Sequence, residues 1–260
     1  MNLENKVVIV TGGSSGIGAA IAKLFIKEGA KVAIVGRNEN KLRAVTAECE
    51  KLGSKPLVIT ADVSKDAEAK KIIDTTISQF GQLDVLVNNA GIGKSAGISD
   101  PNALQVYDEV MGVNLRSVVV LSHYATPHLV KSKGNIINIS SVASLGVMSA
   151  KSFAYCASKA GLDHFTRCIA LELAPSGVRC NNVNPGPVQT DILENSGMNE
   201  AYQAAIWNNF KNSTALGRIS DPIEIAEVVL FLASDKAQCI TGSSFIADNG
   251  TILKGGLKAA

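Results

Sequence analysis

Short apolar runs alternate along this chain of 260 residues with longer segments whose apolar positions recur at helical spacing. The apolar runs predict strands at Lys6–Val10, Val32–Val35, Leu57–Thr60, Val85–Val87, Asn135–Ile139, Val178–Val183 and Ser244–Ala247. The segments between them predict helices at Gly16–Glu28, Glu39–Lys51, Lys65–Phe80, Ala103–Lys133, Ser152–Leu173 and Asp221–Ala233. Continuously apolar strands separated by amphipathic helices are typical of a parallel sheet covered on both faces. We therefore expect an α/β fold with a doubly wound parallel sheet of roughly seven strands.

No linker or run of like charges divides the chain, so residues 1–260 are expected to form a single domain. One segment, from Pro185 to about Thr214, reads as irregular and follows the carboxyl end of a predicted strand, where open α/β sheets bind ligands. We expect a substrate lid at about residues 190–214. Its apolar candidates are Ile192, Leu193, Met198 and Trp207. They fit either the wall of an apolar pocket or the ordinary packing of an amphipathic lid helix.

Composition narrows the class of protein. Hydrophobic residues make up 46% and charged residues 18% of the chain, which excludes intrinsic disorder. The 25 basic and 23 acidic residues nearly cancel, so charge gives no reason to expect a nucleic-acid or membrane-surface partner. The amino terminus does not resemble a signal peptide, and no apolar run approaches the ~18 to 20 residues of a membrane helix. Five scattered cysteines suggest neither disulfides nor a metal site, so we expect a reducing, cytoplasmic location.

A glycine-rich loop follows the first predicted strand and opens directly into a helix. It reads Thr11-Gly12-Gly13-Ser14-Ser15-Gly16-Ile17-Gly18. Glycines there let the backbone approach a pyrophosphate, and the free amides at the start of the helix favour its negative charge. A tight turn without a ligand is the alternative, but the position between strand and helix favours dinucleotide binding.

The end of the second strand usually distinguishes the two nicotinamide dinucleotides. An acidic residue there would bind the ribose 2′-hydroxyl of NAD(H), whereas this chain has Gly36-Arg37-Asn38. A guanidinium can pair with the 2′-phosphate of NADP(H), so NADP(H) is preferred, with NAD(H) still possible. A solvated surface arginine, with Glu39 nearby, is the alternative interpretation.

Tyr155 and Lys159 lie four residues apart at the start of a predicted helix and therefore share one face, and Ser141 follows the fifth strand. Such a pair alone is a weak signal, but together with the other motifs it becomes specific. The chain closely resembles the classical short-chain dehydrogenase/reductase family over nearly its whole length. The motifs behind this resemblance are Thr11–Gly18 (TGxxxGxG), Asp62-Val63, Asn88–Gly91 (NNAG), Asn114, Ser140-Ser141, Tyr155–Lys159 (YxxxK) and Pro185-Gly186 followed by Thr190.

The resemblance implies a Rossmann-type fold, a nicotinamide cofactor and no metal. The implied cofactor-binding residues are Gly12, Ser14, Ser15, Gly16, Ile17, Gly18, Arg37, Asp62, Val63, Asn89, Ala90, Gly91, Asn114, Tyr155, Lys159, Pro185, Gly186, Val188 and Thr190. The implied catalytic residues are Asn114, Ser141, Tyr155 and Lys159. In these roles Tyr155 exchanges a proton with the substrate oxygen, and Ser141 hydrogen-bonds the developing oxyanion. Lys159 favours the phenolate and holds the nicotinamide ribose, while Asn114 supports a water that relays protons to it.

Taken singly, Ser141 could be a helix cap and Asn114 a satisfied core amide. Tyr155 also lies fourteen positions after Ser141, one more than is commonest in the family, which makes Ser141 less secure than Tyr155. We expect an NADP(H)-dependent carbonyl reductase or alcohol dehydrogenase for a fairly apolar ketone or aldehyde, assembled as a homotetramer. The alternatives are a reductase of 3-oxoacyl groups on acyl-carrier protein, an NAD-dependent alcohol dehydrogenase and, from another class, an NADP-binding regulator without turnover.

Overall fold

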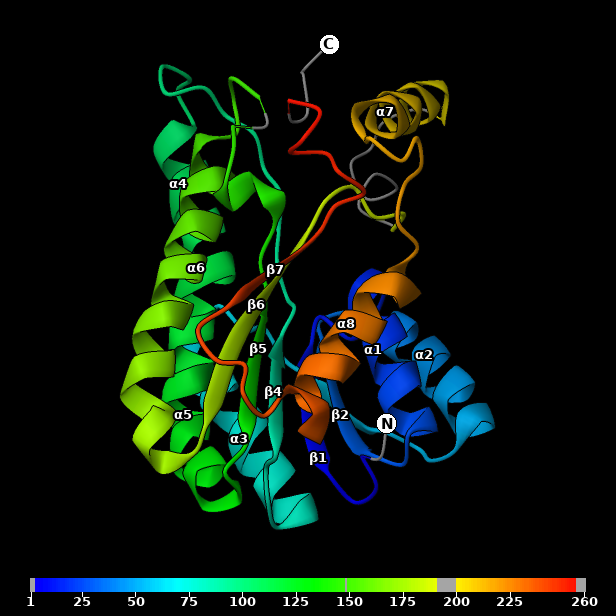
Figure 1. Ribbon diagram of the computed structural model, residues 1–260, viewed down its shortest axis with the longest axis vertical. Coiled ribbons are helices and arrows are strands. Elements are labelled where there is room, and N and C mark those ends of the chain that lie inside the picture. Colours follow the sequence, from blue (N-terminus) through cyan, green and yellow to red (C-terminus); the bar gives the residue numbers. More distant parts are fainter. Residues whose placement is uncertain (1–2, 148, 191–199, 256–260) are drawn as a thin grey trace.

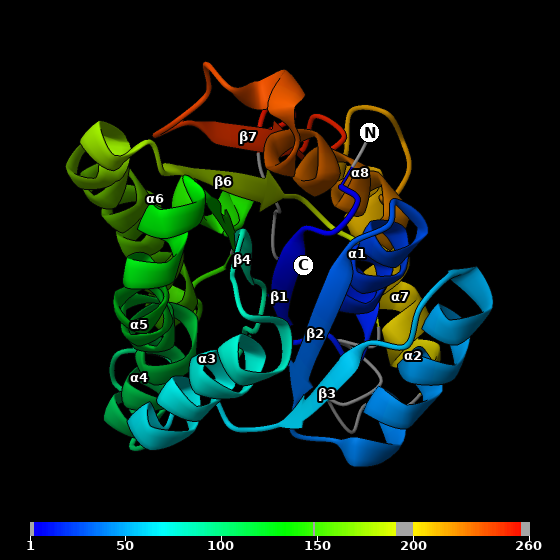
Figure 2. The same ribbon diagram turned by 90° about the horizontal axis from the view of Figure 1, so that it is seen from below.

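Seven strands form one parallel sheet in the order β3-β2-β1-β4-β5-β6-β7 in the computed structural model, which describes residues 3–147, 149–190 and 200–255 (Figures 1 and 2). The strands are β1 (Val7–Thr11), β2 (Lys31–Gly36), β3 (Leu57–Thr60), β4 (Val85–Asn88), β5 (Asn135–Ile139), β6 (Arg179–Pro185) and β7 (Ser244–Ala247). Every neighbouring pair is parallel. The predicted doubly wound α/β fold is confirmed, and the strand order reverses between β1 and β4.

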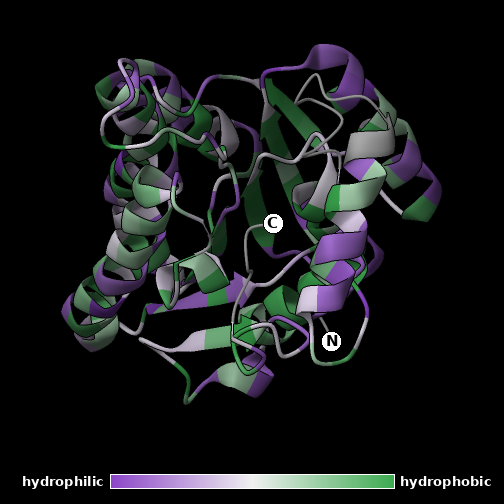
Figure 3. Cartoon of the chain, turned by 90° about the horizontal axis from the view of Figure 1, so that it is seen from above, coloured by the Kyte–Doolittle hydropathy of each residue, from purple (hydrophilic) through white to green (hydrophobic). Residues whose placement is uncertain are grey.

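Helices cover both faces of the sheet, as Figure 2 shows. One face carries α1 (Gly16–Lys27), α2 (Glu39–Leu52) and α8 (Pro222–Ala233), and the other carries α3 (Asp66–Phe80), α5 (Ser117–Ser132) and α6 (Phe153–Leu173). The apolar strands are therefore enclosed between two layers of amphipathic helices (Figure 3). The two large apolar clusters lie one on each face, and β1 contributes alternate residues to them: Val8 and Val10 to one, Val7 and Ile9 to the other.

The predicted long helix Ala103–Lys133 is present but not uniform. It consists of α4 (Ala103–Met111), a π-helical turn η1 (Gly112–Arg116) and α5. A π-turn accommodates one extra residue without breaking the helix, so it leaves little trace in the hydrophobic period. Asn114 lies within this turn and is fully buried.

The segment that reads as irregular in the sequence contains a helix, α7 (Glu200–Ser213), so that expectation was wrong for this stretch. Its apolar residues are less sharply gathered on one face than those of α2 or α3, so its helical period is weaker. The helix lies beyond the carboxyl ends of the strands, at the top of Figure 1. Of the lid candidates, Trp207 is described, whereas Ile192, Leu193 and Met198 lie outside the described residues.

The described residues contain neither a membrane-spanning helix nor a cluster of metal ligands. Among the described helices, none combines the length and apolar character that crossing a bilayer requires. Within the same residues, no group of three or more His, Cys, Asp or Glu side chains is placed to hold a metal ion, and the five cysteines are free thiols.

Candidate active site

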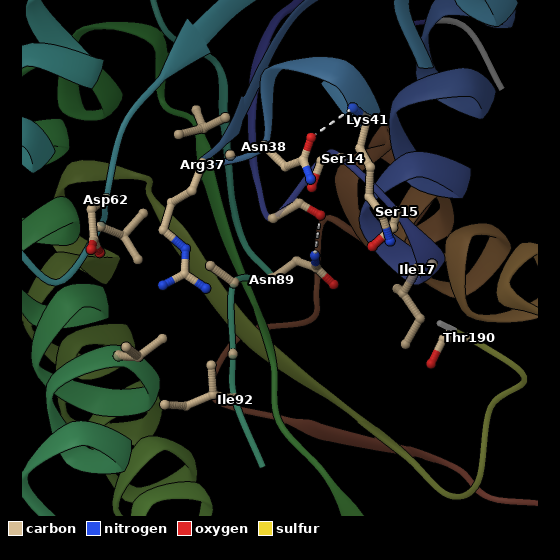
Figure 4. A pocket seen from close by; sticks show the side chains of 18 of the residues that line it. Ser14, Ser15, Ile17, Arg37, Asn38, Lys41, Asp62, Asn89, Ile92 and Thr190 are labelled. Carbon is tan, nitrogen blue, oxygen red and sulfur yellow. Dashed lines mark hydrogen bonds between the residues drawn. The ribbon is translucent and has the colours of Figure 1, made fainter. Parts of the chain in front are cut away.

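A cleft of about 920 Å³ opens where the strand order reverses, at the carboxyl ends of β1 and β4 (Figure 4). Open α/β sheets bind ligands at this position because the loops from the two sides diverge there. Most of the predicted cofactor residues line it, namely Gly12, Ser14, Ser15, Gly16, Ile17, Arg37, Asp62, Val63, Asn89, Ala90, Gly91 and Thr190.

The glycine-rich loop meets steric demands that only glycine satisfies. Gly12 has φ +65°, and a Cβ there would lie 2.8 Å from the Asn89 amide nitrogen. At Gly18 a Cβ would come within 2.2 Å of the Gly12 carbonyl oxygen. Gly18 does not line the cleft, so it acts by allowing the loop to close on helix α1. The result is a floor of bare backbone at a helix amino terminus, which fits a pyrophosphate.

Hydrogen bonds tie the two loops of this floor together. The Asn89 amide donates to the carbonyl oxygens of Thr11 at 2.9 Å and Gly12 at 3.2 Å. In return, the Thr11 hydroxyl accepts from the backbone N–H groups of Asn89 and Ala90 at 3.0 and 3.1 Å. The loop after β1 is therefore held rigidly against the loop after β4, and the cleft between them is preformed.

Arg37 extends its guanidinium into the cleft opposite Asp62, as Figure 4 shows. The side chain comes from the end of β2, where Asn38 caps α2 by accepting a hydrogen bond from the Lys41 N–H at 3.0 Å. Burial opposes ionisation of Asp62, but hydrogen bonds from Ser64 and the positive charge of Arg37 hold the pKa of Asp62 below its usual range. Arg37 thus places a positive charge at one end of the cleft.

A smaller pocket of about 220 Å³ adjoins the other end of the cleft. Predicted residues from five segments meet there: Ile17, Ser141, Tyr155, Lys159, Pro185, Gly186, Val188, Thr190 and Trp207. Phe210 of α7 also lines it, and its ring lies edge-on to that of Trp207 at 5.8 Å between centroids. The pocket therefore joins one hydroxyl-rich wall to a largely apolar one.

The polar wall contains the hydroxyls of Tyr155 and Ser141, which interact with each other. The Ser141 hydroxyl also accepts from the Ala143 N–H at 3.1 Å, so it caps a short 3-10 turn, η2 (Val142–Ser144), as well as facing Tyr155. Burial raises the pKa of Tyr155, and this shift is partly opposed by the neighbouring Ser141 hydroxyl. The phenol is thus protonated at neutral pH.

Lys159 lies one helical turn after Tyr155, with its ammonium 5.8 Å from the centre of the phenol ring. It donates a hydrogen bond to the Ile139 carbonyl oxygen at 2.8 Å. Burial lowers the pKa of Lys159 to about 8, although the negative charge of Asp163 opposes the shift. The ammonium therefore remains largely charged near pH 7, but it loses its proton more readily than a surface lysine does.

Comparisons with known proteins agree with this geometry. A family model described as Enoyl-(Acyl carrier protein) reductase matches residues 12–251. The chain is 35% identical to L-fucose dehydrogenase of Mus musculus, over 99% of this chain and 92% of that protein. It is 34% identical to meso-2,3-butanediol dehydrogenase of Serratia marcescens, over 98% of each. A short-chain dehydrogenase/reductase of unknown function from Caenorhabditis elegans, solved with cofactor, superposes with a TM-score of 0.90 at 36% identity, over 96% of each chain.

The chain belongs to the short-chain dehydrogenase/reductase family. It is accordingly an oxidoreductase of that family, whose members interconvert alcohols and carbonyl compounds with a nicotinamide cofactor, NAD(P)(H).

Asn114 occupies a different position from the other predicted residues of this short-chain dehydrogenase/reductase. Its side-chain oxygen accepts from the Ile92 N–H at 2.8 Å, and its amide donates to the Ile92 carbonyl and to the Ser158 hydroxyl at 3.0 and 3.1 Å. The side chain is a satisfied core amide that lines neither the cleft nor the small pocket. It supports the strand-end loop that carries Gly91, beside Lys159.

Sequence reasoning missed three polar residues around the site. Lys41 lines the cofactor cleft, and its position in the first turn of α2, four residues after Arg37, was the available signal. Asp163 and Asn184 form a buried pair behind Tyr155 and Lys159. Their helix and strand are adjacent only in the folded chain, so no sequence spacing reveals the pair.

Proposed function

We propose that this protein is an NADP(H)-dependent carbonyl reductase, or in reverse an alcohol dehydrogenase, for a fairly apolar ketone or aldehyde. The main support is the placement of the Tyr155 and Ser141 hydroxyls beside Lys159 in a small pocket that opens onto the dinucleotide cleft. Ile92, Ile139, Val188 and the rings of α7 make the rest of that pocket apolar, which suits a hydrocarbon substituent.

In the reductive direction, protonated Tyr155 donates its proton to the carbonyl oxygen of the substrate. Ser141 hydrogen-bonds the same oxygen as negative charge develops on it. Lys159 favours the resulting phenolate by its charge. A bound nicotinamide supplies hydride in reduction and accepts it in oxidation, and Pro185, Gly186 and Thr190 are the residues proposed to meet it, with the ribose held by Tyr155 and Lys159. Oxidation of an alcohol uses the same residues in the opposite order.

The preference for NADP(H) rests on Arg37. It faces the cleft from the end of β2, where the chain offers no carboxylate for a ribose 2′-hydroxyl, and a guanidinium matches a phosphate in geometry and charge.

The first experiment titrates the protein with NADPH and NADH and repeats both titrations on Arg37→Ala. We expect NADPH to bind more tightly and the variant to lose about 10- to 100-fold in NADPH affinity, with NADH little changed. Arg43→Ala is the matched control, because Arg43 is an exposed arginine of α2 that pairs with Glu39 and does not line the cleft. Equal binding of the two cofactors, or tighter NADH, would contradict the preference.

An NAD-dependent alcohol dehydrogenase is the alternative. Two of the named relatives are dehydrogenases of L-fucose and meso-2,3-butanediol, which favours oxidation of a hydroxylated substrate but does not bear on the cofactor. The reductase for carrier-linked 3-oxoacyl groups would need a basic docking surface for an acidic carrier. Lys94, which lines the cleft, and Lys151, four residues before Tyr155, are instead paired with Glu109 and Asp100. A substrate screen that includes apolar ketones, diols and a 3-oxoacyl thioester separates these possibilities.

The homotetramer and the lid remain part of this proposal. Apolar side chains are exposed on the outer helices and on the edge strand, including Leu104 of α4, Leu171 of α6 and Ile246 of β7. Burying such residues between copies of the chain would stabilise a closed assembly. Size-exclusion chromatography with light scattering tests this expectation, and a monomer would contradict it. The lid assignment at about 190–214 is supported by Trp207 and Phe210 in the pocket wall.

A further inference from the structure

A buried polar pair lies between helix α6 and strand β6, directly behind the catalytic candidates. Asp163 is 3% exposed and Asn184 is fully buried. The Asn184 amide donates to the Asp163 carboxylate at 2.8 Å, to the Ser144 hydroxyl at 2.9 Å and to the Ser141 carbonyl oxygen at 3.2 Å. One side-chain amide therefore connects a buried charge to the backbone of Ser141.

This connection fixes the short segment on which Ser141 is carried. The Ser141 carbonyl accepts a second hydrogen bond, from the Ser144 hydroxyl at 2.7 Å, so two donors hold one peptide group. Ser141 is extended, with φ −168°, immediately before the 3-10 turn η2. Because two donors hold its carbonyl oxygen, the Ser141 backbone is fixed, and the direction of its side chain toward Tyr155 is held as well. The extra residue in the loop between Ser141 and Tyr155 makes such an anchor more necessary.

The same pair places a negative charge near Lys159. Asp163 follows Lys159 by one turn on α6, and it is the charged group that acts on the Lys159 ammonium within the described structure. The other groups around this ammonium are Tyr155, which is titratable, and the neutral Ile139 carbonyl. Arg167, a further turn along α6, is exposed and contacts the His164 ring. The carboxylate that acts on the Lys159 ammonium is therefore a buried one, Asp163.

Burying the Asp163–Asn184 pair lowers the stability of the fold, so stability alone does not explain why the pair is present. The second oxygen of Asp163 and the side-chain oxygen of Asn184 have no hydrogen-bond partner among the described residues. A buried carboxylate with an unsatisfied oxygen usually stabilises a fold less than apolar side chains of similar volume. A role in the reaction accounts for its presence better than a contribution to stability does.

We propose that Asp163 and Asn184 are positioning residues for the reaction: Asn184 orients the backbone of Ser141, and Asp163 holds Asn184 while setting a compensating negative charge one turn from Lys159. Neither residue lines the substrate pocket, so both act through Ser141 and Lys159. This inference deepens the proposed function and rests on it for the identity of the reacting residues.

The test replaces Asp163 by Asn, which keeps the shape and one acceptor oxygen but removes the charge. Thr166→Val is the matched control. Thr166 is fully buried on the same helix and is hydrogen-bonded to Asn138 of β5 at 2.8 Å and to Asn182 of β6 at 2.6 Å. Among the described residues, its side-chain hydrogen-bond partners include neither Ser141 nor Lys159. Both variants disturb one buried polar network between α6 and the sheet, so thermal unfolding should show comparable losses of stability.

Two measurements, kcat and the pH dependence of the reductive rate, distinguish a positioning role of Asp163 from a contribution to stability alone. With the substrate found in the screen, Asp163→Asn should lower kcat about 10- to 100-fold, whereas Thr166→Val should stay within about twofold of the parent. Removing a negative charge weakens proton binding by the coupled Tyr155 and Lys159, whichever of them holds the proton. The alkaline limb of the reductive rate should therefore move to lower pH by about half a unit or more in Asp163→Asn, and should not move in the control.

A further measurement needs no substrate, so it separates this inference from the proposed function. In cofactor-free protein with ¹³C-labelled lysine, the Cε resonance of Lys159, assigned by its loss in Lys159→Met, reports the lysine titration. The parent midpoint is expected at about 8, and the Asp163→Asn midpoint below it. A midpoint unchanged by Asp163→Asn overturns the proposal whether or not a substrate is known.

Asn184→Ala serves as a second variant if Asp163→Asn does not fold. It retains the carboxylate and removes the link to Ser141. We expect kcat to fall by about tenfold or more, with the KM for the cofactor unchanged, because the Ser141 backbone loses a donor. A kcat equal to that of Thr166→Val would overturn the positioning role of Asn184.

Discussion

The dinucleotide cleft and the substrate pocket differ in the chemical groups that form them. The dinucleotide cleft is formed mainly by backbone, in the loops after β1 and β4, and the bonds between Thr11 and Asn89 hold its shape. The substrate pocket is formed by side chains from five separate segments, with Tyr155 and Ser141 on one wall and Trp207 on another. A site formed by backbone loses binding when an added side chain blocks it. A site formed by side chains loses activity when one of their functional groups is removed. Substitutions of each kind should therefore separate binding from turnover.

The largest effect is expected from Tyr155→Phe. Removing the hydroxyl takes away the proposed proton donor without changing the shape of the partly buried ring, so kcat should fall by about 10² to 10⁴-fold. The affinity for NADPH, measured by fluorescence titration, should stay within a few fold of the parent because the cleft is otherwise untouched. Unchanged turnover would exclude Tyr155 as the acid and would remove the main support for the proposed function.

Gly12→Ala tests the backbone half and should have the reverse signature. Alanine at φ +65° is strained, and its Cβ would press on the Asn89 amide at 2.8 Å, so the tie between the two loops must shift. We expect NADPH affinity to fall by about tenfold or more, with a loss of stability of about 1 to 3 kcal/mol.

Gly93→Ala is the control for this substitution. Gly93 lines both the cleft and the small pocket, yet a Cβ there would meet nothing within 4 Å. NADPH affinity should therefore remain within about twofold of the parent, measured by the same titration. Equal losses in the two glycine variants would show that the cleft does not depend on the fit of its backbone.

Elements with a strong local pattern of apolar residues could be predicted from the sequence, and elements with a weak one could not. Strands such as Asn135–Ile139 and Leu57–Thr60 were predicted with their observed bounds, because short runs rich in Ile, Leu, Val and Thr stand out between longer segments of helical spacing. The π-turn around Asn114 was not predicted, since one extra residue hardly changes the helical period over a long helix. Helix α7 was missed because its apolar residues are less sharply gathered on one face than those of α2 or α3.

For the site, residues in contiguous motifs were recoverable and residues paired across the fold were not. The loop at Gly12, the Arg37 position and the Tyr155 and Lys159 spacing each depend on a local relation that the chain itself displays. The contact between Asp163 and Asn184 depends on packing of α6 against β6. The two residues become neighbours only after the sheet has formed, so neither their residue types nor their spacing in the sequence predicts the contact.

The smallest effect is expected from Trp207→Ala, a change in the apolar wall of the substrate pocket. The indole forms part of the pocket wall and contacts the Phe210 ring, and it holds no reacting atom. If the wall binds the substrate, KM should rise by a few fold, about 1 kcal/mol or more, and the rise should grow with the size of an apolar ketone while kcat changes little. Phe210→Leu, which keeps an apolar side chain in the same wall, should change KM less. A KM that is flat across the ketone series would show that Trp207 only packs the lid, and that substrate size is read by the segments nearer Tyr155.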